Sequence, residues 1–190
     1  QISYVLGAFY YEEEGNVVAP GVFGFGTVKQ TPSFEMDNDA TAIYAQVEYT
    51  PAWLDRLTIG AGARYTDENR SISNARLVLN DAIELMNVDR AKASFSNTSP
   101  SFFVNYKVTP ELNTYFRYAE GWRSGGFNGR SSTNEQLRTP FEPESLKAYE
   151  IGLKGSVLDN RIGFNIAGFI SDYTDLQTAV TQPTVTGVGF

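Results

Sequence analysis

The residue types behind most enzyme chemistry are missing from this chain, which has no histidine and no cysteine. It therefore offers no zinc site of the usual kind, no thiol nucleophile and no imidazole base. Two acidic runs remain. Residues 12–14, three glutamates, are typical of a solvated rim, and residues 37–39 lack the glycine and distal glutamate of a calcium loop. We predict no catalytic residue, no metal site, no cofactor and no enzyme activity.

Arginines, aromatic rings and an amide are concentrated in residues 121–138, where they suit noncovalent binding. Guanidinium groups bind carboxylates and phosphates, and aromatic faces contact sugar or catecholate rings. The predicted ligand-binding residues are Trp122, Arg123, Phe127, Asn128, Arg130 and Arg138. The alternative interpretation is structural, because the glycines of this segment let the chain turn and Arg123 can pair with Glu120.

Composition narrows the class of protein and of partner. The 190 residues are 42% hydrophobic and 14% aromatic, with 17 glycines and a formal net charge of −7. The apolar content argues against disorder, and the aromatic and glycine content favours strands and turns. Because the chain is acidic, we expect no nucleic acid partner.

Hydrophobic residues alternate with a period of two along most of the chain, which predicts an all-β fold. Seven extended segments are expected, at residues 1–12, 40–50, 56–69, 93–107, 112–123, 144–157 and 161–173. In residues 144–157, for example, Ile151 and Leu153 lie on one face while Glu150 and Lys154 lie on the other.

The connections between these segments alternate between short and long. Short turns are expected at residues 51–55, 108–111 and 158–160, and long loops at 13–39, 70–92 and 124–143, with a fourth beginning at 174. In outer-membrane β-barrels the periplasmic turns are short and the extracellular loops are long. The pattern therefore favours an antiparallel, up-and-down transmembrane β-barrel segment. A soluble β-sandwich with large loops is the alternative.

The strand alternation assigns the two faces of such a barrel wall. The residues expected to face lipid are Ile43, Val47, Leu57, Ile59, Ile151 and Leu153. Those expected to face the lumen are Gln46, Glu48, Arg64, Glu150 and Lys154. A shift of one residue would move Lys154 into hydrocarbon, at a cost of about 2–4 kcal/mol near the midplane. The register is therefore strongly determined.

Several motifs together resemble one protein family. The run YAEGWRSGGFNGR over Tyr118–Arg130 is similar to a strand-to-loop segment of TonB-dependent outer-membrane receptors. Phe141–Glu144 and Tyr149–Lys154 resemble the strand that follows in that family, and residues 159–177 resemble the next hairpin. Upstream, Leu57–Tyr65 is similar to another strand of these barrels. The resemblance covers nearly the whole chain in the right order.

This resemblance implies a fold, a location and an activity. The family's barrel has 22 strands, so seven strands are about a third of it. Residues 1–190 would belong to that barrel domain, and no element of the family's N-terminal plug domain is recognisable in them. The implied activity is energy-coupled import, across the outer membrane of a Gram-negative bacterium, of a scarce, bulky nutrient such as a ferric siderophore, a cobalamin or a glycan.

The implied partners are outer-membrane lipid, the plug domain and remaining barrel strands, the TonB protein and the small-molecule ligand. Two other function classes remain open from the residues alone. One is a passive porin or small outer-membrane barrel. The other is a soluble β-sandwich module that binds carbohydrate.

Overall fold

One antiparallel sheet dominates the computed structural model, which describes residues 1–23, 28–131, 133–179, 182–184 and 187–189. Strands pair in the order β1-β3-β4-β5-β6-β7-β8, and the short β2 pairs with β3. The strands of this sheet are β1 (Ile2–Val18), β2 (Gly21–Phe23), β3 (Val28–Tyr49), β4 (Leu57–Leu79), β5 (Ile83–Thr109), β6 (Leu112–Arg123), β7 (Glu144–Val157) and β8 (Ile162–Thr174). The predicted all-β, up-and-down architecture is confirmed.

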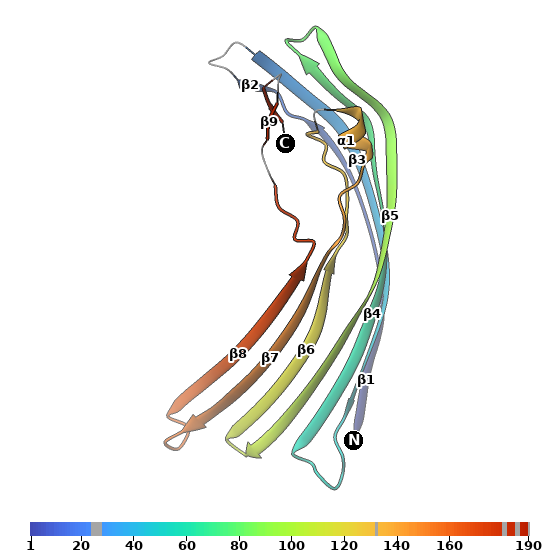
Figure 1. The fold of residues 1–190 in the computed structure, drawn as a ribbon. Helices are drawn as coiled ribbons and strands as arrows, with labels where there is room; N and C mark the ends of the chain where they lie inside the picture. The colour runs from blue at the N-terminus through green and yellow to red at the C-terminus, as the bar shows by residue number, and fades with distance from the viewer. Residues whose placement is uncertain (24–27, 132, 180–181, 185–186, 190) are drawn as a thin grey trace.

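The remaining elements are a short helix, α1 (Asn134–Arg138), and a hairpin of β9 (Gln182–Thr184) with β10 (Gly187–Gly189). The large sheet is curved, and α1 and the chain after β8 lie on its concave side (Figure 1). In the described part of the chain the other sheet is the two-stranded β9–β10 hairpin, which is too small to form the second layer of a sandwich. None of the described helices has the length and apolar character needed to cross a membrane.

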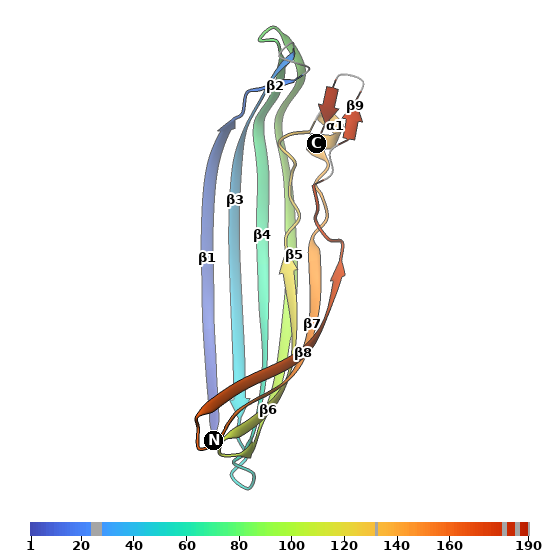
Figure 2. The same ribbon diagram turned by 90° about the vertical axis from the view of Figure 1, so that its left-hand side faces the viewer.

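The three predicted short turns and the N-terminus lie at one end of the sheet, and the long connections lie at the other (Figures 1 and 2). β6, β7 and β8 match their predicted segments to within a residue. The connection between β6 and β7 is the predicted loop over residues 124–143, and it contains α1.

Two of the predicted long loops are wrong, because residues 13–39 and 70–92 are mostly strand. β1 and β3 stay paired along the whole of β1, and β4 and β5 stay paired to the tip of their hairpin. Asn80 and Asp81, both at positive φ, make a tight turn there. These upper strand segments carry many polar side chains on both faces, so the period-two hydrophobic signal fades before the strands end.

A small apolar cluster lies on the concave face near the long-connection end. It consists of Phe34, Ile72, Ala75, Leu77, Met86, Val88, Phe127 and Leu137. Leu137 comes from α1, whose first turn is capped by the Thr133 hydroxyl accepting from the backbone N–H of Gln136 at 3.2 Å. Burial of Leu137 and Phe127 therefore holds the loop with α1 against β3, β4 and β5.

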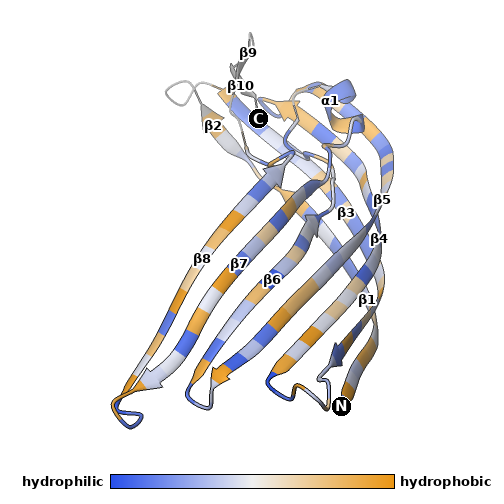
Figure 3. Ribbon diagram, turned by 60° about the horizontal axis from the view of Figure 1, so that its bottom comes forward, coloured by the Kyte–Doolittle hydropathy of each residue, from blue (hydrophilic) through white to orange (hydrophobic). Residues whose placement is uncertain are grey.

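Large apolar side chains are exposed on the convex face, toward the short-turn end. Tyr4 and Leu6 are both 78% exposed, and Ile151 and Ile166 are 63% and 65% exposed. Apolar and polar residues alternate along much of β7, which carries bands of both kinds in Figure 3, whereas β8 has apolar residues at neighbouring positions such as Phe169 and Ile170. A continuous apolar surface of this kind is the expected lipid contact of a membrane β-barrel.

Candidate ligand-binding site

The cross-strand register places the five predicted lumen-facing residues on one face of the sheet. One row of paired residues runs through Glu48, Gly60, Phe103, Arg117 and Glu150. Gln46, Arg64 and Lys154 alternate in phase with this row. Arg70, also in phase, contacts the loop that lies on the concave side. All five residues therefore occupy the concave face.

The six residues expected to face lipid share the opposite, convex face. Leu57 and Leu153 belong to one cross-strand row, and Ile59 and Ile151 belong to the next. Ile43 and Val47 are in phase with Ile59 across the β3–β4 pairing.

Polar groups on the concave wall bond to one another. The Gln46 amide donates to Glu48 at 2.9 Å, and the Tyr115 hydroxyl donates to the Glu150 carboxylate. The Tyr115 ring lies directly over Gly152, where a β-carbon would collide with it. These contacts fix the side chains against the wall, so this stretch of the concave face is a preformed surface.

A hollow of about 770 Å³ opens at the upper ends of β6, β7 and β8. Four of the six predicted ligand-binding residues line it: Arg123, Phe127, Asn128 and Arg130. The rest of the lining comes from residues 141–142 and 175–179. The volume is within the range of sites for small-molecule ligands.

The loop that carries these residues is folded back on itself. Gly126 and Phe141 form a bridge in which each backbone N–H donates to the other's carbonyl oxygen, at 3.2 and 2.8 Å. Asn128 makes a tight turn, because its side-chain oxygen accepts from the backbone N–H of Arg130 at 3.0 Å. Gly125 is required there, since a β-carbon would collide with the Phe141 carbonyl oxygen.

Two side chains from distant parts of the chain hold the loop in place. Arg70 of β4 donates to the Ser124 hydroxyl at 2.9 Å and to Glu68 at 2.7 Å. Gln177, just beyond β8, donates to the backbone oxygens of Ser124 at 2.9 Å and Glu142 at 3.1 Å. The hollow is therefore built from three parts of the chain that are fixed to one another.

The structure leaves two predicted binding residues outside the hollow. Along β6, Trp122 is in phase with Tyr118 and out of phase with its neighbour Arg123, which lines the hollow on the concave side. The Trp122 side chain therefore lies on the convex face. There it is placed like an aromatic residue of the outer membrane interface. Arg138 is exposed in the last turn of α1, because its neighbour Leu137 occupies the side of the helix that packs into the apolar cluster. Neither side chain lines the hollow with Arg123.

The second wall of the hollow, formed by Glu142, Asp175 and Gln177, was not among the predicted binding residues. A signal for it was present. When residues are paired outward from the β7–β8 turn, residue 174 lies opposite residue 145. This pairing brings the chain after β8 beside residues 141–144.

The charges around the hollow are mixed. Arg123 and Arg130 contribute guanidinium groups, and Glu142 and Asp175 contribute carboxylates. Such a site can bind a ligand that carries both anionic oxygens and hydrogen-bond donors. Phe127 is only 7% exposed and offers little ring surface. Together with the apolar convex face, these features are those of the wall of an outer-membrane barrel with a hollow at its rim.

A family model supports this class. The model described as TonB dependent receptor-like, beta-barrel matches residues 2–190, so the chain belongs to that family. Its members are receptors of the Gram-negative outer membrane and not enzymes, which confirms the predicted family and location.

Two curated relatives carry the same name, the metal-pseudopaline receptor CntO, in two strains of Pseudomonas aeruginosa. Each is 25% identical to this chain over 135 residues, which is 71% of the chain. The matched region is 17% of each relative's length.

Two solved structures share the fold. The ferric yersiniabactin uptake receptor FyuA of Yersinia pestis superposes with a TM-score of 0.76 at 18% identity, over 93% of this chain and 26% of that one. The alcaligin outer-membrane receptor FauA of Bordetella pertussis gives a TM-score of 0.53 at 16% identity, over 96% and 32%.

Proposed function

We propose that this chain is the part of a TonB-dependent receptor that binds a metal chelate at the rim of its barrel, for energy-coupled import. The observation that carries the proposal is the hollow between the β6–β7 loop and the chain after β8, with Arg123 and Arg130 in its lining. Guanidinium groups suit the carboxylate or catecholate oxygens of a chelator.

The names of the relatives support one of the three substrate classes considered. Their names refer to metal-pseudopaline, ferric yersiniabactin and alcaligin. Among the three nutrients considered, a siderophore or related metal chelate is therefore favoured over a cobalamin or a glycan. Carboxylates of the lining, Glu142 and Asp175, would accept donors at the ligand's periphery.

In this proposal the concave face, with Gln46, Glu48, Arg64, Glu150 and Lys154, borders the lumen and the plug domain. The convex face contacts outer-membrane lipid. TonB supplies the energy through a part of the receptor other than this barrel wall. No bond of the ligand has to be broken, so binding and release are sufficient.

Transport assays in a strain lacking the receptor gene test the function. The intact receptor is restored from a plasmid, and uptake of labelled metal chelates, cobalamin and an oligosaccharide is measured with and without TonB. We expect uptake of a metal chelate that is lost without TonB. Uptake that persists without TonB would indicate a passive porin, and uptake of the oligosaccharide alone would refute the substrate class.

A further inference from the structure

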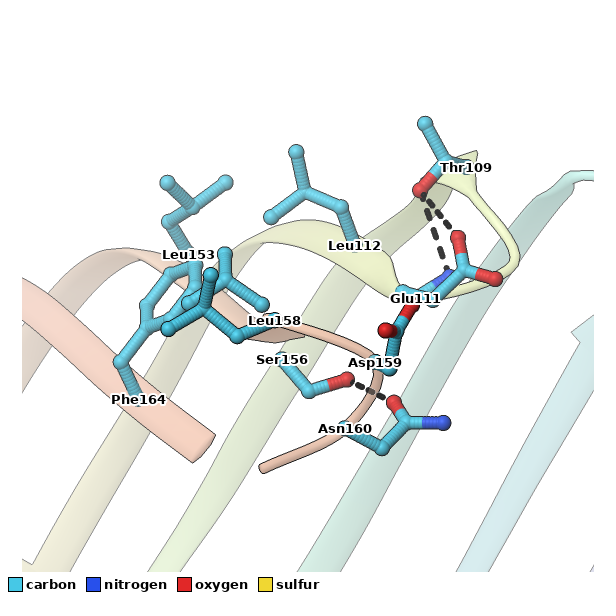
Figure 4. Close-up of a pocket in the computed structure, with 10 residues that line it drawn as sticks. Thr109, Glu111, Leu112, Leu153, Ser156, Leu158, Asp159, Asn160 and Phe164 are labelled. Atoms are coloured by element: carbon cyan, nitrogen blue, oxygen red, sulfur yellow. Dashed lines mark hydrogen bonds between the residues drawn. The ribbon is translucent and has the colours of Figure 1, made fainter. Parts of the chain in front are cut away.

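A second hollow lies at the opposite end of the sheet, where β6, β7 and β8 meet their short turns. Its volume is about 610 Å³. Leu112, Leu153 and Phe164 form an apolar side, and Glu111, Asp159 and Asn160 lie beside them at the turns (Figure 4). This hollow shares no residue with the one at the rim.

The apolar side of this hollow opens on the convex face. Leu112, Gly155 and Phe164 form one cross-strand row, in phase with the row of Phe116 and Ile151. Gly155 leaves the space between the two larger side chains, and a β-carbon there would lie 2.6 Å from the Glu111 carbonyl oxygen. The hollow therefore faces the same surroundings as the exposed apolar surface of the sheet.

Interfacial aromatic residues fix the height of the hollow in the membrane. Tyr106 lies in the same cross-strand row as Leu153, and Trp53, 80% exposed, lies in the short turn before β4. Tyrosine and tryptophan concentrate where acyl chains meet headgroups. Because short turns of outer-membrane barrels are periplasmic, this is the headgroup level of the periplasmic leaflet.

The backbone of the β7–β8 turn is unusual. Leu158, Asp159 and Asn160 have φ of 56°, 54° and 65°, a region that a leucine side chain disfavours. The turn nevertheless carries Leu158 into the lining of the hollow, where it remains 66% exposed. An apolar side chain held exposed at this level is suited to contact with lipid.

The charged residues of the lining determine which lipid headgroup the hollow would favour. Glu111 and Asp159 are acidic, and no lysine or arginine is among the described residues that line the hollow. Of the cations nearby in the sequence, Lys107 and Lys154 lie in the cross-strand row of Asn113 on the concave face, and Arg161 directly follows the β7–β8 turn but is not part of the lining. The Asn160 side-chain oxygen accepts from the Ser156 hydroxyl, which leaves its amide N–H groups to donate to a phosphate oxygen.

We propose that this hollow binds one phospholipid with a primary ammonium headgroup from the periplasmic leaflet. An acyl chain would lie against Leu112, Leu153 and Phe164, and the ammonium group would lie between the Glu111 and Asp159 carboxylates. The inference concerns how the barrel is held in its membrane, and it stands or falls independently of the transported ligand.

Native mass spectrometry of the intact receptor tests the proposal. The delipidated protein is offered equimolar phosphatidylethanolamine and phosphatidylcholine with the same acyl chains. We expect the ethanolamine lipid to be retained over the choline lipid by about threefold, the size expected of exposed ion pairs. The E111Q/D159N double variant should lose this preference. The matched control D55N, at another turn of the same end, should keep it.

Two further variants keep the test decisive. D159N alone suits the turn, because asparagine readily adopts positive φ, so it replaces the double variant if that one fails to fold. Phe164→Ala should lower retention of both lipids and leave their ratio unchanged. Equal retention of the two lipids by the unmodified receptor, or a preference that survives E111Q/D159N, would overturn the proposal.

Discussion

The two halves of the sheet differ in height. β3, β4 and β5 have 22, 23 and 27 residues, whereas β6, β7 and β8 have 12, 14 and 13. About 9–11 residues suffice to cross a bilayer, so the shorter strands do little more than span it. The longer strands continue well beyond the ends of β6–β8 (Figure 2). The hollow between the β6–β7 loop and the chain after β8 lies at the step between the two heights.

The convex face of the tall half changes character along its length. Near the short turns it is apolar, but above Tyr65 it carries a polar lattice. The Asn69 amide donates to Asp39 at 2.8 Å and the Ser71 hydroxyl donates to Asp37 at 3.0 Å. Side chains that satisfy one another in this way suit a water-facing surface. The same strands are therefore suited to hydrocarbon near the short turns and to water farther up, with the boundary near Tyr65.

The largest expected effect is on the apolar cluster of the tall half. Ile72 is fully buried, and Ile72→Ala leaves a cavity that should cost about 2–5 kcal/mol. Since the cluster holds Leu137 and Phe127, proteolysis of the 124–143 loop should become much faster while the membrane-spanning part stays folded. Limited proteolysis of the receptor in vesicles measures this. An unchanged cleavage rate would show that the cluster does not anchor the loop.

A charge placed on the convex face distinguishes its two parts. Ile151→Arg puts a cation into the hydrocarbon and should lower the free energy of unfolding by about 2–4 kcal/mol. Ser96→Arg, on the same face above Tyr65, replaces an exposed side chain and should change it by less than about 0.5 kcal/mol, as ordinary surface substitutions do. Denaturant titration in vesicles compares the two. Equal losses would mean that the membrane boundary has been misplaced.

Loss of Gln177 should loosen the hollow without unfolding the barrel. Its amide makes two hydrogen bonds to loop carbonyls, and each is worth about 0.5–1.5 kcal/mol. Gln177→Ala should therefore speed hydrogen exchange in residues 124–143 by about tenfold. The neighbouring Thr178→Ala is the control. If both variants exchange equally, Gln177 does not hold the loop.

Cysteine labelling tests the assignment of faces without relying on a change in stability. A cysteine at Ile151 should react with a lipid-soluble reagent, and one at Glu150 with a water-soluble reagent. These residues are neighbours on β7 that point to opposite faces. The reverse labelling pattern would show that the concave face is not the aqueous one.

The two halves also differ in how far the sequence could predict them. In β6–β8 the predicted segments matched the strand ends, because these strands do little more than span the bilayer and are bounded by turn-forming residues. In β1–β5 the strands continue beyond the membrane. There, cross-strand rows such as Asp39–Asn69–Ser94 are polar, so no hydrophobic alternation marks the strands in the sequence. The upper hairpins were therefore read as loops, although Asn80–Asp81 is a recognisable turn.

The candidate site was predictable where it is contiguous in sequence. Arg123, Asn128 and Arg130 follow one another along the loop, and all of them line the hollow. Glu142 and Asp175 were missed because their position depends on pairing across β7 and β8. Trp122 was included because spacing along the loop does not reveal which face a strand-end residue occupies.

In the proposed function, the ligand binds in the hollow between the β6–β7 loop and the chain after β8. The most direct test of this proposal is ligand affinity of the intact receptor carrying Arg130→Ala, with Arg138→Ala as the matched control outside the hollow. We predict that Arg130→Ala weakens binding by at least about 1 kcal/mol, roughly fivefold in Kd, while Arg138→Ala leaves it unchanged. Equal affinities for both variants and the unmodified receptor would contradict the claim and assign capture to other loops.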